Sequence, residues 1–163
     1  MSTEKTLIAG FGNLLRGDDG FGVEVVNRLG ASALPAHAQT MDVGIGGMHF
    51  VLRLMEGFEV VIVVDAVQHG QPPGTLYVFT PAEVDLGLDS GERIDPHFAE
   101  PARSLKFAKA LGVLPGRVTV VGCEPESCHL GQCLSLPVSV AVDRAVQTIR
   151  DMVGADGRRR AAG

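Results

Sequence analysis

Two adjacent carboxylates, Asp18 and Asp19, stand in a glycine-rich segment just ahead of a predicted helix. An aspartate at a helix start is favoured as an N-cap, and we assign that structural role to Asp18. A second carboxylate beside it gains less from capping and is repelled by its like-charged neighbour. Asp19 is therefore better explained if a cation or a substrate group compensates its charge.

A third carboxylate, Asp65, ends the aliphatic run Val60–Val64 and should stand at the mouth of a sheet. A lone aspartate there can simply bind its own loop, whereas two anions facing one cleft need a cation. Two histidines could complete such a site. His97 follows Pro96, which restricts the neighbouring backbone, and His69 lies four residues after Asp65. The residues alone leave both histidines open.

Alternating strand and helix patterns must position these side chains. Strands are predicted at Thr6–Ala9, Gln39–Val43, Val60–Val64, Thr75–Thr80 and Arg117–Val121, and helices at Phe21–Leu29, Met48–Met55, Pro101–Leu111 and Pro137–Met152. Only nine residues, Ala66–Gly74, precede the fourth strand, too few for a parallel crossover, so Thr75–Thr80 should run antiparallel. The predicted fold is α/β, a three-layer α/β/α domain with a five-stranded mixed sheet.

Loops that follow parallel strands lie at one edge of such a sheet, where ligands bind. The segments that meet this condition are Gly10–Gly20, Val43–Gly47, Asp65–Gly70 and Cys123–Cys128. We therefore expect Asp19 and Asp65 to share one edge.

Length and charge limit the classes of function. The 163 residues fit one domain, predicted to span 1–153 and to be followed by a flexible tail at 154–163. The net charge of −5 argues against nucleic-acid binding, and the longest apolar run, Val60–Val64, is too short for membrane insertion. Without a signal-peptide pattern, the expected location is cytoplasmic, and the three cysteines should be reduced thiols.

Two other motifs carry weaker alternatives. Gly10-Phe11-Gly12 partly matches a dinucleotide-binding loop, but Leu15 stands where the third glycine belongs, and the two aspartates would repel a pyrophosphate. Cys123, Cys128 and Cys133, with His129, match no recognised zinc or iron–sulfur spacing. We interpret these cysteines as structural thiols, with a nucleophilic Cys128 as the alternative.

Taken in order, the motifs resemble those of hydrogenase maturation endopeptidases. They are Gly10–Gly22, Val60–Ala66, Pro96-His97 and Val121–Ser127, within a resemblance from Leu7 to Met152. The resemblance implies an enzyme that removes a C-terminal extension from the nickel-loaded large-subunit precursor of a [NiFe] hydrogenase. It also implies a mixed five-stranded sheet and a metal site formed by Asp19, Asp65 and His97. The metal that this site recognises is the nickel carried by the precursor.

Two carboxylates and one imidazole leave coordination positions open on a metal, as a catalytic or recognition site requires. The metal could polarise the scissile carbonyl and activate water, or only report that the precursor is loaded. The resting site would be empty or hold another divalent ion. The second hypothesis is a chaperone that holds the nickel-loaded precursor without cutting it, and the third is a nucleotide-binding enzyme that uses Gly10–Gly12.

Overall fold

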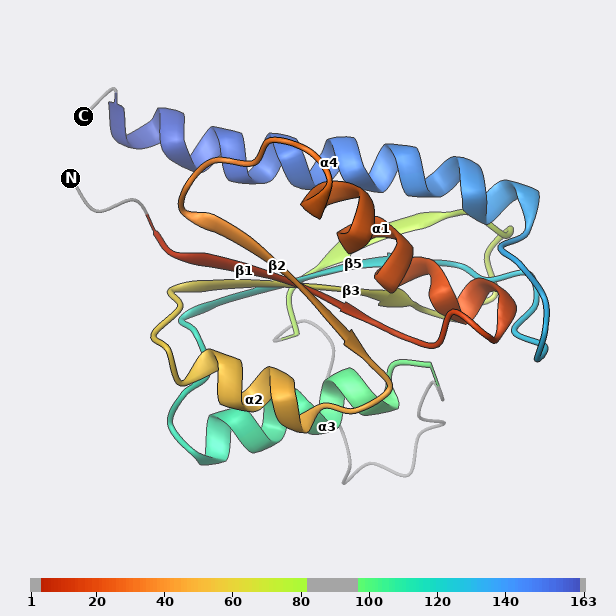
Figure 1. The fold of residues 1–163 in the computed structure, drawn as a ribbon, viewed down its shortest axis with the longest axis horizontal. Helices are drawn as coiled ribbons and strands as arrows, with labels where there is room; N and C mark the ends of the chain where they lie inside the picture. Colours follow the sequence, from red (N-terminus) through yellow and green to blue (C-terminus); the bar gives the residue numbers. More distant parts are fainter. Residues whose placement is uncertain (1–3, 82–96, 162–163) are drawn as a thin grey trace.

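Aliphatic, β-branched runs form a sheet that helices cover on both faces in the computed structural model, which describes residues 4–81 and 97–161 (Figure 1). The strands are β1 (Thr6–Phe11), β2 (Ala38–Gly44), β3 (Val60–Ala66), β4 (Leu76–Phe79) and β5 (Arg117–Cys123). The helices are α1 (Phe21–Gly30), α2 (Met48–Leu54), α3 (Ala99–Ala110) and α4 (Leu136–Ala161), and a 3-10 turn, η1 (Gly17–Gly20), precedes α1.

The strand order is β2-β1-β3-β5-β4, in which β4 alone is antiparallel to its neighbour. This arrangement confirms the predicted fold class and the direction of the fourth strand. In the register, Phe11 pairs with Gly44, and Ala66 pairs with Cys123. The carboxyl ends of the four parallel strands therefore align at one edge, as the positions of the loops predicted.

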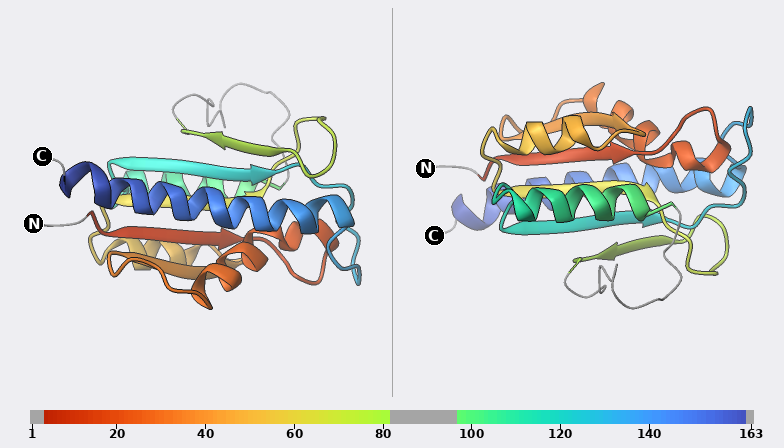
Figure 2. Two further views of the ribbon diagram at one scale, coloured as in Figure 1. Left: turned by 90° about the horizontal axis from the view of Figure 1, so that it is seen from above. Right: turned by 90° about the horizontal axis from the view of Figure 1, so that it is seen from below.

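Two hydrophobic cores lie on opposite faces of the sheet. Helices α1 and α4 cover one face, and α2 and α3 cover the other (Figures 1 and 2). Adjacent strand residues alternate between the two cores, so that Ile8 joins the α1/α4 core while Leu7 joins the α2/α3 core. Strand β3 is buried at every position because both of its faces are covered.

Glycines let α1 approach the sheet closely. A Cβ atom on Gly22 would overlap the carbonyl oxygens of Val64 and Phe11, and one on Gly10 would overlap the carbonyl oxygen of Gly22. Close backbone packing therefore explains these glycines, and they need no bound nucleotide to account for them.

The sequence predicted the end of the last helix wrongly. Helix α4 continues to Ala161, whereas the expected helix ended at Met152. The flexibility expected of residues 154–163 stays a prediction. Gly154 and Gly157, which lie in this extension, lower helix propensity by about 1 kcal/mol each, but no proline interrupts the helix there. Within the described ranges, no helix is both long enough and apolar enough to cross a membrane.

Some expectations fall on residues 82–96, outside the described part of the chain. One of them is the restriction that Pro96 was expected to place on the backbone next to His97.

Candidate functional site

The turn that carries the two aspartates depends on a glycine after β1. Gly12 has a φ of +122°, and a Cβ atom there would overlap the backbone carbonyl of Asp19. The Asn13 side chain then accepts a hydrogen bond from the Leu15 amide at 2.9 Å, which tightens the turn before η1. The conformation of Gly12 and the Asn13 hydrogen bond thus place Asp19 beside the carboxyl end of β1.

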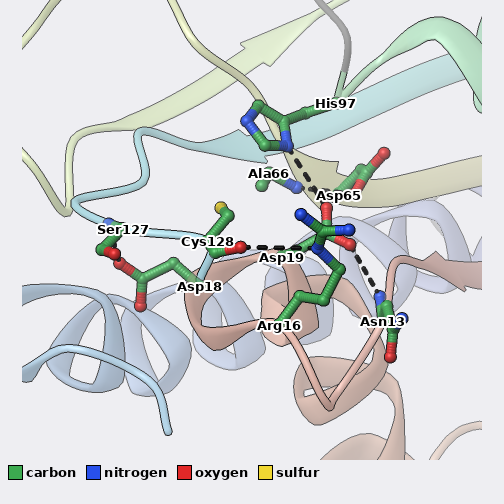
Figure 3. A network of polar contacts seen from close by, with 9 residues as sticks. All are labelled: Asn13, Arg16, Asp18, Asp19, Asp65, Ala66, His97, Ser127 and Cys128. Carbon is green, nitrogen blue, oxygen red and sulfur yellow. Dashed lines mark hydrogen bonds and ion pairs between the residues drawn. The ribbon is translucent and has the colours of Figure 1, made fainter. Parts of the chain in front are cut away.

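Asp19 and His97 meet at this edge although 78 positions separate them. Asp19 Oδ1 lies 3.3 Å from His97 Nδ1, and Asp19 Oδ2 accepts a hydrogen bond from the Asn13 amide at 3.0 Å (Figure 3). The Asp19 side chain is 17% exposed and the His97 side chain 20% exposed. Both groups are therefore held by polar contacts while still reachable from solvent.

Asp65 lies next to this pair but is more deeply buried. It is 1% exposed at the end of β3, and its Oδ1 accepts a hydrogen bond from the Ala66 amide at 2.8 Å. Figure 3 shows its side chain beside those of Asp19 and His97. The three predicted residues thus share one edge of the sheet.

A different residue joins Asp19 and His97 in a group of side chains that could hold a metal ion. In the described part of the chain, one such group of at least three residues emerges, formed by Asp19, His97 and Cys128, whose ligand atoms all lie within 4.8 Å of one another. Asp65 is not a member of it. We call Asp19, His97 and Cys128 the donor cluster.

The structure separates the three cysteines, which are all free thiols. Cys123 is buried at the end of β5, where burial, followed by the charge of Asp18, raises its pKa to about 12. Cys133 is exposed, and Cys128 is half-buried beside the site. From the sequence, Cys128 was kept only as an alternative nucleophile, and its position in the donor cluster was not predicted. Its place in the loop after β5, on the predicted edge, was the signal that could have identified it.

Asp18 is structural, but the predicted N-cap is wrong, because Gly20 caps α1 without a side-chain hydrogen bond. The fully buried Asp18 carboxylate accepts four hydrogen bonds instead. They come from the amides of Glu126 (2.8 Å), Ser127 (3.1 Å) and Ser135 (2.7 Å) and from the Ser135 hydroxyl (2.8 Å). We call this contact between η1 and the loop at 126–135 the loop latch. It holds the loop of Cys128 against the turn of Asp19.

A second buried carboxylate, Glu124, fixes the loop after β3. It accepts hydrogen bonds from the His69 amide at 2.8 Å, the Gly70 amide at 3.0 Å and the Tyr77 hydroxyl at 2.6 Å. Burial acts to raise the pKa of Glu124, but the hydrogen bonds from Tyr77 and the backbone amides outweigh it and hold this pKa below the ordinary 4.5. No role had been assigned to Glu124 from the sequence.

His69 belongs to this second region. Its ring packs edge-on against Tyr77, with 4.9 Å between the ring centroids, and it also contacts Phe79. Of the two histidines that the sequence left open, His97 is the one in the donor cluster.

The donor set suits a divalent transition metal. It combines a carboxylate oxygen, an imidazole nitrogen and a sulfur, and the buried Asp65 carboxylate lies beside it. Imidazole and thiolate favour zinc, nickel or cobalt over magnesium or calcium. Because the donors are partly exposed, an ion held there would be reachable from solvent.

Comparisons with known proteins agree with this geometry. The family model described as hydrogenase maturation protease matches residues 23–152. The hydrogenase expression/formation protein HupD of Rhodobacter capsulatus is 33% identical, over 91% of this chain and 71% of its own length. The Escherichia coli hydrogenase-maturating endopeptidase HybD superimposes with a TM-score of 0.81, 27% identity and 94% coverage of both chains. A hydrogenase 2 maturation peptidase from a Thaumarchaeota archaeon gives 0.68 and 36%, over 93% of this chain and 99% of its own. The chain belongs to the hydrogenase maturation protease family.

Proposed function

We propose that this protein removes the C-terminal extension of a nickel-loaded [NiFe] hydrogenase large-subunit precursor. A member of this protease family is a hydrolase. The substrate and the site residues of this protein are the parts that we assign. The single observation that carries our assignment is the 3.3 Å approach of Asp19 Oδ1 to His97 Nδ1 at the carboxyl edge of the sheet. We infer that the reaction takes place in the cytoplasm, because the three cysteines are free thiols.

We assign the metal contacts, and with them the catalytic role, to Asp19, Asp65 and His97. Asp19 and His97 lie close enough for a shared ion. Asp65 lies outside the 4.8 Å group, so its coordination needs a movement of its side chain or an ion placed toward β3.

Nickel enters this scheme as part of the precursor. When bound, a divalent metal supplies Lewis-acid polarisation of a carbonyl oxygen. The protein's own residues orient the site. The Asn13 amide holds one oxygen of Asp19, and Asp19 in turn holds the His97 ring through Nδ1. The same contacts would serve a recognition role, in which nickel marks the loaded precursor and positions its peptide.

Incubation of the purified protein with nickel-loaded precursor tests the proposal. We expect a loss of mass at the precursor's C-terminus with the wild-type protein and none with Asp19→Asn. A wild-type protein that binds the loaded precursor and leaves it intact would instead support the non-cleaving chaperone. A parallel incubation with nickel-free precursor should leave the substrate uncut, and cleavage there would contradict the role of nickel.

A further inference from the structure

Cys128 is the third corner of the donor cluster, and the proposed function gives it no task. Its Sγ lies within 4.8 Å of ligand atoms of both Asp19 and His97. Bonds of about 2.0–2.3 Å place neighbouring donors on one ion about 3–4 Å apart. Modest side-chain adjustments would therefore bring all three residues onto a single ion.

The loop of Cys128 is fixed by contacts that also fix Asp19. The Asp18 amide donates to the Ser127 carbonyl at 2.9 Å, next to Cys128, and the Asp18 carboxylate closes the loop latch. Arg16 Nε donates to the Cys128 carbonyl at 3.4 Å (Figure 3). The segment from Arg16 to Gly20 thus contains Asp19 and also holds the backbone of Cys128. The fold of this segment therefore brings the Cys128 sulfur close to Asp19.

We propose that Cys128 binds, as a thiolate, to the divalent cation held by Asp19 and His97. Coordination forms a metal–sulfur bond, breaks the S–H bond and releases its proton to solvent. A thiolate shifts the preference of the site toward nickel, zinc or cobalt and away from magnesium or calcium. This inference rests on the proposed metal site, and it gives Cys128 the task of selecting the ion.

Cobalt(II) titration of the full-length protein tests this assignment, because a thiolate on cobalt produces a strong near-ultraviolet charge-transfer absorption. We expect the band in the wild-type protein and in Cys133→Ser, the matched control at an exposed cysteine. Cys128→Ser should lose the band and bind cobalt about 10–100-fold more weakly. An unchanged band and affinity in Cys128→Ser would overturn the proposal.

A second measurement tests the same assignment without substituting Cys128. Cadmium should slow alkylation of the Cys128 thiol by iodoacetamide in the wild-type protein but not in Asp19→Asn, with peptide mass spectrometry as the readout. Equal alkylation rates with and without cadmium in the wild-type protein would contradict thiolate coordination.

Two results separate this inference from neighbouring ones. If Cys128→Ser keeps its cobalt affinity but no longer cleaves the precursor, Cys128 is a nucleophile and the ligand assignment is wrong. If cobalt binds equally to the wild type, Asp19→Asn and His97→Ala, the metal site of the proposed function fails together with the ligand assignment. Loss of binding in those two variants, with Cys128→Ser unaffected, overturns the cysteine ligand alone.

Discussion

The loop latch and the donor cluster begin at neighbouring residues, Asp18 and Asp19, and use their carboxylates in opposite ways. Asp18 is fully buried and accepts four hydrogen bonds, three of them from backbone amides. Asp19 is 17% exposed and accepts one backbone hydrogen bond, with its other oxygen facing His97. A buried and saturated carboxylate stabilises a fold, whereas one shared between solvent and an imidazole is placed for chemistry.

The difference arises in η1, where consecutive side chains leave the turn in different directions. Asp18 reaches the loop at 126–135, and Asp19 reaches His97 (Figure 3). A single turn therefore supplies both the support of the loop at 126–135 and the proposed metal ligand Asp19. Substitutions at the two positions should accordingly separate stability from activity.

Replacing Asp19 should have the largest effect on activity. In Asp19→Asn the amide oxygen can still accept from the Asn13 amide, but the negative charge opposite His97 is lost. We expect processing of the nickel-loaded precursor to fall at least about 100-fold. The melting temperature should change by no more than about 2 °C. Initial cleavage rates and a thermal melt measure both effects, and a rate within tenfold of wild type would place Asp19 outside the site.

Replacing Asp18 should give the reverse pattern. In Asp18→Asn an NH2 group takes the place of one acceptor oxygen, so that a donor faces either Ser135 or the amides of Glu126 and Ser127. A buried donor without an acceptor costs about 1–3 kcal/mol, which lowers the melting temperature by about 2–12 °C. Differential scanning calorimetry measures this shift. An unchanged melting temperature would mean that the loop latch does not stabilise the fold.

Glu124 extends the comparison to acid stability. Because its folded pKa is below the ordinary 4.5, the stability it contributes is fully present above pH 4.5 and is lost as the pH falls through the folded value. Glu124→Gln should be less stable near neutral pH and should lose less of its stability on acidification. Urea unfolding at a series of pH values from neutral into the acid range measures this. Parallel pH profiles for the two proteins would contradict the assignment.

The smallest effect is expected at the other histidine. The His69 ring packs on Tyr77 and lies outside the donor cluster. We expect His69→Ala to keep processing within about twofold of wild type, since substitutions away from special features change free energies by about 0.5 kcal/mol. His97→Ala is the matched comparison and should lose processing to the same extent as Asp19→Asn. Equal losses in the two histidine variants would show that the site extends to the loop after β3.

Much of the fold followed from the sequence because its signals are local. The buried run at β3 and the short loop before β4 were sufficient to predict a mixed sheet with an antiparallel strand. The helix periodicities placed α1 and α2 to within a residue or two at their ends. The end of α4 was missed because glycines lower helix propensity without forcing a break.

The site was less predictable because its contacts are long-range. Asp18 was interpreted as a cap from its immediate neighbours, but its partners lie 108 to 117 positions away. Cys128 was set aside because its spacing to the other cysteines fits no metal motif, and the fold brings it to Asp19 instead. The sequence predicted only that the loops after the parallel strands share one edge of the sheet. That rule gives the positions of the loops but not the directions of their side chains.

Locating a bound ion tests the central claim most directly. Crystals of the protein soaked with nickel or cadmium should show an anomalous peak at about 2.0–2.5 Å from a carboxylate oxygen of Asp19 and a ring nitrogen of His97. Density from that ion to Cys128 Sγ or to Asp65 would define the remaining ligands. Ions bound only elsewhere, with no peak between Asp19 and His97, would contradict a metal site at this edge of the sheet.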